Sequence, residues 1–381
     1  MKKIAVLTGT RADFGILTPV MEAIDKHQDL DLSVIATGMH TIPEFGNTIE
    51  IVKGTFPNTH QVPISMNTNT ARATIKGMAE CTTGTNELLD TLNPDMFLFL
   101  GDRSESYAAT IAPLVRGIPI AHIHGGDRTK AGLDEYFRHA LTKISNLHFP
   151  ATSKSAERIV RLGENPQYVF NVGSPSLDTI LNKGLLPRGE LYSKYGISRK
   201  KPLVLMIQHP VTSQIDASGE QIRATLQAIE EEDLEALVIY PNNDPGHESI
   251  IEEIEKRRGK SGFYIHKNLP HIDYLSAIRD SDLVIGNSSS STIDGSAFRT
   301  PIINVGIRQE GRERGNNVLD VGYNMLEIRH AINTCLHNSD FRRQVAESQS
   351  PYGNGTAGKQ IAEILAEIEI TPEMMQKQIT Y

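Results

Sequence analysis

Residues 282–294 read Asp-Leu-Val-Ile-Gly-Asn-Ser-Ser-Ser-Ser-Thr-Ile-Asp, and this stretch decides the fold. A short apolar run ends at Gly286, and small polar residues lead into an expected helix that carries Asp294. A buried strand that turns into a helix in this way is typical of a parallel α/β sheet. Hydroxyls and the N–H groups at a helix start can donate to phosphate, and a carboxylate can accept from a ribose diol, so the stretch favours a nucleotide diphosphate site. The alternative is an ordinary serine-rich loop in which Ser or Thr caps the helix.

Similar apolar runs recur along the chain, separated by segments long enough for helices. We predict strands at 4–7, 32–36, 96–100, 118–123, 147–149, 168–172, 203–207, 236–239, 263–265, 283–285 and 302–305. A proline-containing connector around 173–202 divides them into two sets. The pattern therefore predicts an α/β protein with two doubly wound parallel-sheet domains, residues 1–175 and 176–360, followed by a segment at 361–381.

Composition excludes several classes of protein. The 381 residues are too many for one ordinary core, and the formal net charge of −8 argues against nucleic acid as a partner while leaving room for a local phosphate pocket. Cys81 and Cys335 lack metal-ligand spacing, so we expect plain buried thiols in a reducing cytoplasm. The first apolar run ends before Thr8, which is too short for export or membrane insertion.

Polar residues follow the predicted strands, at the edge where parallel sheets bind ligands. Asp102, Asp127 and Asp134 can share acid and base roles, because crowded carboxylates have pKa values that are pushed apart. For Glu105 and Glu135 we favour a helix N-cap or a surface ion pair. Two such polar edges suggest a ligand-binding cleft between the domains.

Histidine and arginine residues add candidates for binding an anion. His209 lies between a strand and Pro210 and could donate to a phosphate or a leaving oxygen, although a loop histidine satisfied by backbone is the alternative. Arg308 lies in a loop where a planar guanidinium could bind a diphosphate, or where charges are simply solvated. His122 and His124 alternate along a strand, so at least one should face the interior. No histidine pair has the spacing of a zinc site, and neither a P-loop nor a strand-linked Gly-x-Gly-x-x-Gly is present.

Several ordered motifs together resemble the UDP-N-acetylglucosamine 2-epimerase family, specifically its hydrolysing branch. The motifs lie at residues 9–15 (GTRADFG), 37–40 (TGMH), 101–103 (GDR), 122–127 (HIHGGD), 138–143 (RHALTK), 208–212 (QHPVT), 240–244 (YPNND) and 286–294. Arg11-Ala12-Asp13 stands where non-hydrolysing relatives usually carry Arg-Pro-Glu.

The resemblance implies a GT-B fold of two Rossmann-like domains with the active site in the cleft between them, and a C-terminal helix that packs back on the first domain. It also implies a reaction without metal or redox cofactor: UDP-N-acetylglucosamine loses UDP to give a 2-acetamidoglucal, and water then adds to give N-acetylmannosamine, a precursor of sialic acid. We expect a cytoplasmic homodimer or homotetramer with a UDP-linked sugar as its ligand.

The resemblance also assigns residues. Asp102, Asp127, Asp134 and His209 are the expected catalytic residues, and Asp294 stands where relatives have a ribose-binding glutamate. The expected substrate-binding residues are Arg11, Asp13, His40, Arg103, His139, Asn243, Asp244, Ser288, Ser289, Ser290, Asp294 and Arg308. None is expected to bind a metal.

Departures from the family pattern leave the sugar open. Asp127 and Asp294 are one methylene shorter than the usual glutamates, and Ser291 and Ile293 replace a common glycine and arginine. A UDP- or GDP-linked 2,4-diacetamido-trideoxyhexose is therefore an alternative substrate. A glycosyltransferase of the same fold and a non-catalytic nucleotide-sugar sensor are the rival functions.

Overall fold

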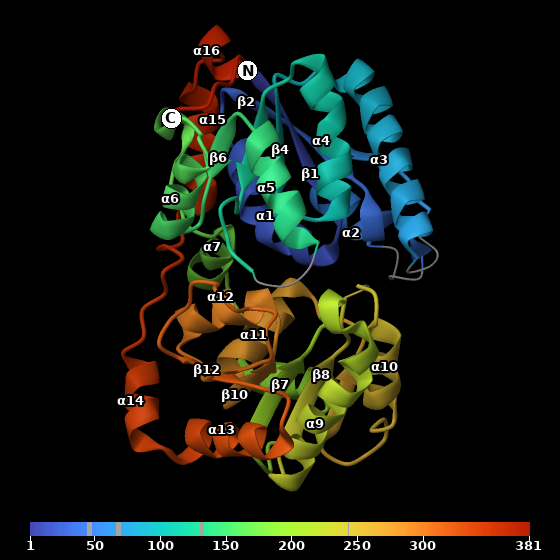
Figure 1. Ribbon diagram of the computed structural model, residues 1–381, viewed down its shortest axis with the longest axis vertical. Helices are drawn as coiled ribbons and strands as arrows, with labels where there is room; N and C mark the ends of the chain where they lie inside the picture. The colour runs from blue at the N-terminus through green and yellow to red at the C-terminus, as the bar shows by residue number, and fades with distance from the viewer. Residues whose placement is uncertain (44–47, 66–69, 130–132, 243) are drawn as a thin grey trace. The chain divides into compact units, whose positions relative to one another are not determined.

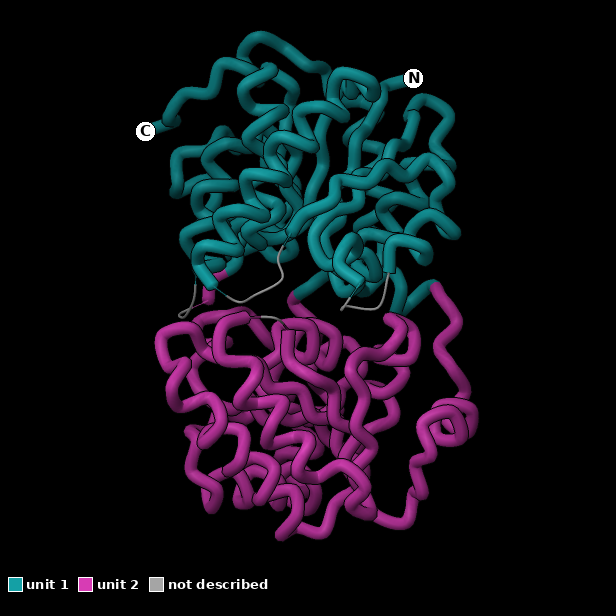
Figure 2. Tube along the Cα trace, turned by 90° about the vertical axis from the view of Figure 1, so that its right-hand side faces the viewer, with its two compact units in different colours: residues 1–127, 133–182, 352–381 teal, residues 128–132, 183–351 magenta. Residues whose placement is uncertain are grey.

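The computed structural model describes residues 1–43, 48–65, 70–129, 133–242 and 244–381, and it divides into two compact units (Figure 2). Unit 1 comprises residues 1–127, 133–182 and 352–381, and unit 2 comprises residues 128–132 and 183–351. Unit 1 extends past residue 175 because helix α7 (Pro175–Asn182) packs against other helices of unit 1. The chain rejoins unit 1 at Tyr352, whose carbonyl accepts a hydrogen bond from Ser174 N.

Unit 1 contains a six-stranded sheet in which every pair of neighbours is parallel (Figure 1). In order across the sheet the strands are β3 (Thr59–Gln61), β2 (Leu30–Ala36), β1 (Lys2–Thr8), β4 (Met96–Leu100), β5 (Ile120–Ile123) and β6 (Leu147–Phe149). The helices are α1 (Arg11–Asp25), α2 (Ile49–Thr55), α3 (Ala71–Leu92), α4 (Ser104–Arg116), α5 (Asp134–Ile144), α6 (Ser153–Arg161), α7, α15 (Ala357–Glu367) and α16 (Pro372–Met375), with short 3-10 turns at Gly38–Thr41 and Pro166–Tyr168.

Unit 2 repeats this topology. Its parallel sheet has the order β12 (Val318–Val321), β11 (Ile302–Val305), β10 (Leu283–Gly286), β7 (Leu203–Ile207), β8 (Glu235–Ile239) and β9 (Phe263–His266). Its helices are α8 (Arg188–Tyr195), α9 (Ser218–Glu231), α10 (His247–Glu255), α11 (His271–Asp280), α12 (Ser289–Phe298), α13 (Met325–His337) and α14 (Ser339–Ala346), with a 3-10 segment at Thr212–Ala217. Both sheets thus have the strand order of a Rossmann fold.

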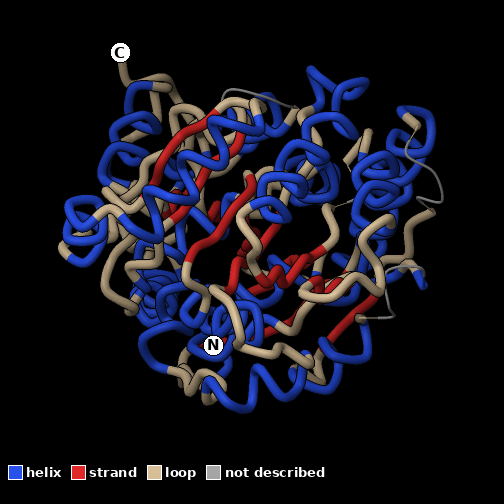
Figure 3. The backbone as a smooth tube through the Cα atoms, turned by 90° about the horizontal axis from the view of Figure 1, so that it is seen from below, coloured by secondary structure: helices blue, strands red, loops and turns tan. Residues whose placement is uncertain are grey.

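The central strands of each sheet are buried on both faces, as their continuous apolar runs predict. Figure 3 shows helices on either side of the strands. In β1, Ile4 and Val6 face a core shared with α1, α2 and α15, whereas Ala5 and Leu7 face a core shared with α3 and α4. In β7, Val204 and Met206 likewise face α9, α10 and α13. The prediction of two doubly wound α/β units is therefore confirmed.

The strand predicted at 168–172 is wrong. Residues 166–168 form a 3-10 turn, and Val169 makes only an isolated bridge with His148. Two edge strands, β3 and β12, escaped prediction because they contain polar residues and are only partly buried. The helix expected near the C-terminus exists as α15 and packs against α1 within unit 1.

Candidate active site

A cluster of charged side chains at the carboxyl edge of the unit 1 sheet centres on Arg138. Asp102 follows β4, and α5 brings Arg138 to it, so that Nε donates to Asp102 Oδ2 at 2.7 Å and Nη2 donates to the same oxygen. Nη1 donates to the backbone carbonyl of Asp127 at 3.2 Å and pairs with Glu135. The Arg138 side chain is 2% exposed, whereas that of Asp102 is 22% exposed. The cluster therefore fixes Asp102 while leaving it partly accessible.

Arg138 keeps its positive charge in spite of its burial. Burial alone would lower the pKa of Arg138, but the carboxylates of Asp102, Asp127 and Glu135 outweigh burial and raise it above its ordinary value. Among the described residues, hydrogen bonds engage Oδ2 of Asp102 and not Oδ1. One carboxylate oxygen of Asp102 therefore holds the guanidinium of Arg138.

His122 in β5 supports this cluster from behind. Its Nε2 donates to the carbonyl of Gly101 at 2.7 Å, and its ring stacks on Phe99 with centroids 4.5 Å apart. Burial lowers the pKa of His122 to about 3, although the bond to Gly101 opposes this shift. His122 is therefore a neutral donor that fixes the residue before Asp102, and the expectation that one histidine of the pair faces the interior is confirmed.

Asp127 lies beyond β5 in a second polar group. Ser155 Oγ donates to Asp127 Oδ1 at 3.0 Å, and His124 Nδ1 lies 3.6 Å from Oδ2. His124 has a φ of 63°, which is rare for a residue other than glycine, and its Nε2 lies 3.0 Å from Ser174 Oγ. Arg138 meets the backbone of Asp127, so these residues and Asp102 belong to one cluster.

The side chains of Asp13 and His40 form hydrogen bonds with neighbouring residues of unit 1. Asp13 forms a capping box with Thr10 at the start of α1 and accepts from Thr8 Oγ1 at 2.7 Å. His40 is fully buried, with Nε2 3.1 Å from Thr8 Oγ1 and Nδ1 2.8 Å from Thr48 Oγ1. Burial lowers the pKa of His40 against the opposing effect of Asp13, and the nearby cation Arg11 lowers it further. The geometry thus gives Asp13 and His40 a structural role beneath the first loop.

Three other expected residues lie around the same edge. Arg103 precedes α4 and pairs with Glu105 at 3.3 Å, but the Glu105 side chain is only 3% exposed, so the ion pair expected at the surface is buried. Asp134 is the first residue of α5. His139 lies one turn along α5 with a 52% exposed side chain, 3.2 Å from Glu135 Oε1. Glu135 therefore joins His139 to Arg138, as an ion-pairing residue.

In unit 2, His209 is held by Asn287, the second residue of the serine loop (residues 286–292). Asn287 Oδ1 accepts from His209 N at 2.7 Å, and Asn287 Nδ2 donates to His209 O at 2.9 Å. His209 Nδ1 accepts from the backbone N–H of Asn242 at 3.0 Å. Because Nδ1 is an acceptor, the neutral ring carries its proton on Nε2 and presents a donor there.

Arg308 and Asp244 extend this group. Arg308 Nη1 donates to the carbonyl of Asn287 at 3.2 Å, and Nη2 lies 3.8 Å from Asp244 Oδ2. Asn242 Nδ2 donates to the same Asp244 oxygen at 2.7 Å. The structure thus brings His209, Asp244 and Arg308 together, while the predicted residue Asn243 lies outside the described residues.

The serine loop begins where two strands meet very closely. Gly286 has a φ of 136°, and a Cβ atom there would lie 1.8 Å from the carbonyl oxygen of Ile207. Ser288 is the N-cap of α12, yet its side chain makes no capping hydrogen bond. The alternative of an ordinary capped helix is therefore wrong for Ser288, and its side chain leaves the N–H groups of the first helical turn uncapped.

Behind this loop lies Tyr274 of α11, whose hydroxyl is 3.2 Å from both Ser290 Oγ and Ser291 Oγ. Asp294 is 1% exposed in the second turn of α12. Burial raises the pKa of Tyr274 above its ordinary value, and the charge of Asp294 adds to the rise. Ser291, which departs from the family glycine, turns its hydroxyl toward Tyr274.

Sequence reasoning did not select Arg138, Asn287 or Tyr274. Arg138 lies in the motif at residues 138–143, next to the expected residue His139, and Asn287 lies in the motif at residues 286–294, next to Ser288. Tyr274 lies in a helix that carried no motif. A signal for Arg138 existed, because it follows Glu135 by one helical turn.

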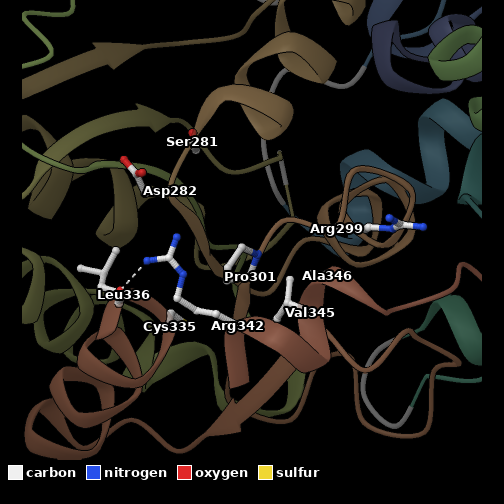
Figure 4. Close-up of a pocket in the computed structure, with 9 residues that line it drawn as sticks. All are labelled: Ser281, Asp282, Arg299, Pro301, Cys335, Leu336, Arg342, Val345 and Ala346. Atoms are coloured by element: carbon white, nitrogen blue, oxygen red, sulfur yellow. Dashed lines mark hydrogen bonds between the residues drawn. The ribbon is translucent and has the colours of Figure 1, made fainter. Parts of the chain in front are cut away.

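A cavity of about 380 Å³ lies elsewhere in unit 2 (Figure 4). Its lining includes Asp282 and Pro301, which precede β10 and β11, so it opens at the amino edge of the sheet. Figure 4 shows Arg342 turned toward the carbonyl of Leu336, to which it donates at 3.0 Å. None of the expected site residues lines this cavity.

Two properties concern metals and membranes. Among the described residues, no group of three His, Cys, Asp or Glu side chains is arranged to hold a metal ion. Within the same residues, no helix is both long and apolar enough to cross a membrane.

Both cysteines are buried free thiols, as expected, and burial raises the pKa of Cys81 to about 11 and that of Cys335 to about 12.

Two Rossmann-like units, one with a carboxylate cluster and one with a serine-rich loop at the start of α12, define a protein of the GT-B class. The model of the UDP-N-acetylglucosamine 2-epimerase family matches residues 22–366. The chain therefore belongs to the UDP-N-acetylglucosamine 2-epimerase family, and the resemblance found in the sequence is confirmed.

Individual relatives support the family and the fold. The chain is 33% identical over 378 residues to UDP-N,N'-diacetylbacillosamine 2-epimerase (hydrolyzing) of Legionella pneumophila, covering 99% of each protein. It is 34% identical over 355 residues to polysialic acid biosynthesis protein P7 of Escherichia coli, covering 92% of this chain and 90% of that one. The structure of UDP-GlcNAc 2-epimerase from Neisseria meningitidis bound to UDP-GlcNAc matches with a TM-score of 0.80 at 19% identity, covering 97% of this chain and all of that chain. The predicted GT-B fold is thereby confirmed.

Proposed function

We propose that the protein is a hydrolysing 2-epimerase that converts UDP-N-acetylglucosamine and water into N-acetylmannosamine and UDP. The observation that carries the proposal is the cluster of Asp102, Asp127 and Glu135 around the buried Arg138. A guanidinium that binds one oxygen of Asp102 holds that carboxylate in a fixed orientation, as a general base requires. The family supplies the class of reaction.

The reaction needs two proton transfers and one bond cleavage at the sugar. A base takes the proton from carbon 2, the electron pair forms the double bond between carbons 1 and 2, and the bond from carbon 1 to the diphosphate oxygen breaks. Water then gives hydroxyl to carbon 1 and a proton to the opposite face of carbon 2. In the proposal Asp102, Asp127 and Asp134 supply the base and the acid.

Unit 2 has the chemistry to hold the leaving UDP. His209 presents an Nε2 donor, and α12 begins with uncapped N–H groups and with serine hydroxyls. Helix starts and charge-assisted donors stabilise phosphate oxygens, whose charge grows as the bond to carbon 1 breaks. We therefore assign UDP to unit 2 and the proton transfers to unit 1.

A second candidate substrate is UDP-N,N'-diacetylbacillosamine. The relative from Legionella pneumophila is named as a 2-epimerase of this sugar nucleotide. Its similarity to this chain covers 99% of both proteins at 33% identity. The same elimination and hydration would apply, because both sugars carry an acetamido group at carbon 2. The two candidates differ at carbons 4 and 6, which lie away from the bonds that change.

Product analysis in heavy water tests the function. Each UDP-sugar is incubated with the protein, and the products are identified by NMR and mass spectrometry. The proposal predicts free UDP and the 2-epimeric free sugar with one deuterium at carbon 2. A UDP-linked epimer without release of UDP, a sugar transferred to an acceptor, or UDP binding without turnover would each overturn it. Faster turnover of the diacetamido sugar would establish the second candidate.

A further inference from the structure

Four hydroxyl groups form a continuous chain behind the serine loop of unit 2. Ser291 Oγ lies 3.2 Å from the hydroxyl of Tyr274, which donates to Ser290 Oγ at 3.2 Å, and Ser290 Oγ lies 3.1 Å from Ser288 Oγ. All four groups belong to α11, α12 or the residue that caps α12. This chain of hydroxyls therefore runs from the first turn of α12 to its N-cap, Ser288.

The direction of this chain follows from counting protons. Each hydroxyl has one proton, so Tyr274, which donates to Ser290, must accept from Ser291. The link between Ser290 and Ser288 uses the proton of one of these two serines. Three hydrogen bonds thus use three of four protons, and the fourth remains on Ser288 or Ser290. The unused donor lies at the start of α12.

The same chain of hydroxyl groups explains why the side chain of Ser288 does not cap α12. An N-cap serine ordinarily accepts from a backbone N–H of the first turn, but Ser288 Oγ instead lies against Ser290. The serine hydroxyl and the backbone N–H groups therefore remain as separate donors at one place. Hydrogen bonds in a directed chain also strengthen one another, so the last donor is a better one than an isolated serine.

We infer that Tyr274 is the positioning residue of the phosphate-binding loop: its hydroxyl directs the chain so that Ser288 or Ser290 donates to a phosphate bound at the start of α12. The inference rests on the proposed binding of UDP by unit 2. Tyr274 itself lies behind the serines, with its ring packed on the core formed by β7, β8 and β10. It acts through the serines.

Calorimetric titration of the full-length protein with UDP, pyrophosphate and uridine tests this role. Tyr274→Phe keeps the ring and removes only the hydroxyl. We expect it to weaken UDP and pyrophosphate about 10-fold, which corresponds to about 1.4 kcal/mol, and to leave uridine within about twofold. Tyr192→Phe is the matched control, because Tyr192 is a buried tyrosine of the same unit whose hydroxyl donates to the carbonyl of Asp280. It should leave the affinity for all three ligands unchanged.

Ser291→Ala tests the direction of the chain and does not depend on the folding of the tyrosine variant. It removes the donor to Tyr274 but leaves the bond from Tyr274 to Ser290, so we expect less than about threefold loss of UDP affinity. A larger loss in Ser291→Ala than in Tyr274→Phe would overturn the assigned direction. Equal loss for uridine and UDP in Tyr274→Phe, or no loss for pyrophosphate, would overturn the positioning role. If the parent binds pyrophosphate and not UDP, the proposed function fails while the inference is still decided by pyrophosphate.

Discussion

The two units share one strand order but carry opposite chemistry at the carboxyl edge of the sheet. In unit 1 this edge carries charged groups, with Asp102 and Glu135 bound to a buried arginine. In unit 2 the corresponding edge carries serine hydroxyls, Asn287 and the Nε2 of His209, beside the charged residues Arg308 and Asp244. The scaffold is the same, so the loops after the strands decide what each unit does.

The difference matches what each half of the proposed reaction needs. Proton transfer requires groups that change charge, and a carboxylate beside a fixed guanidinium does so at a set position. Binding of a leaving diphosphate requires donors that are already oriented, so that little reorganisation accompanies bond cleavage. Variants in one unit should therefore affect turnover, and variants in the other should affect nucleotide affinity.

The largest effect should come from Asp102→Asn. The amide keeps the size of the side chain but cannot take up a proton, so we expect turnover to fall about 100- to 10,000-fold. UDP affinity should remain within about threefold, because Asp102 belongs to unit 1, whereas the residues assigned to UDP belong to unit 2. Steady-state kinetics of UDP release and calorimetry with UDP measure the two quantities. Loss of UDP affinity equal to the loss of turnover would contradict the division of labour between the units.

A stability effect of about 3 kcal/mol is expected for Gly286→Ala in unit 2. The new Cβ would lie 1.8 Å from the carbonyl oxygen of Ile207 at a φ of 136°, so the strands β7 and β10 must separate. Gly184→Ala is the control, because a Cβ there meets no atom within 4 Å. Urea unfolding gives both values, and equal stability of the two variants would show that the close approach is not required.

The strands were predictable because their burial on both faces leaves continuous apolar runs. Residues 96–100 and 203–207 form strands with the predicted bounds. The edge strand β3 was not predictable, since Thr59, His60 and Gln61 are not buried and leave no apolar run. The prediction of a strand at residues 168–172 failed for the opposite reason. An apolar run is present there, but such a run can also belong to a turn.

The site was predictable where a residue directly follows a strand. Asp102 and His209 are of this kind, since the end of a parallel strand fixes where the next side chains lie. Arg138 was not, because it reaches Asp102 from a helix 36 residues further along the chain. Tyr274 was not either, since its role depends on how α11 packs beside α12. Such contacts exist only after the helices have packed.

His209→Asn should have an intermediate effect on nucleotide affinity. The shorter amide can still accept from Asn242 N through its oxygen, but it lacks the Nε2 donor at the same reach. Hydrogen bonds to charged groups contribute about 1.5–3 kcal/mol, so UDP affinity should fall about 10- to 100-fold. Calorimetry measures the affinity, and uridine serves as the control ligand that lacks phosphate. Unchanged UDP affinity would show that His209 belongs with the catalytic residues of unit 1 in function.

The last effect concerns the pH dependence of stability in unit 1. His122 is buried against Phe99 and the carbonyl of Gly101, with His148, Asp102 and Arg138 near it, and its pKa is lowered from 6.5 to about 3. Between these values the unfolded chain binds a proton that the folded protein does not, so the free energy of unfolding falls as the pH falls. One such group contributes a slope of about 1.4 kcal/mol per pH unit.

His122→Gln should remove this slope, because glutamine can donate to Gly101 but does not titrate. Urea unfolding of parent and variant at pH 8, 6, 5 and 4 measures the difference, and other titrating groups cancel in it because both proteins carry them. The variant should lose less stability than the parent between pH 6 and pH 4. Parallel curves would mean that the charged edge of unit 1 does not depend on a neutral histidine beneath it, and Asp102 would then be positioned by Arg138 alone.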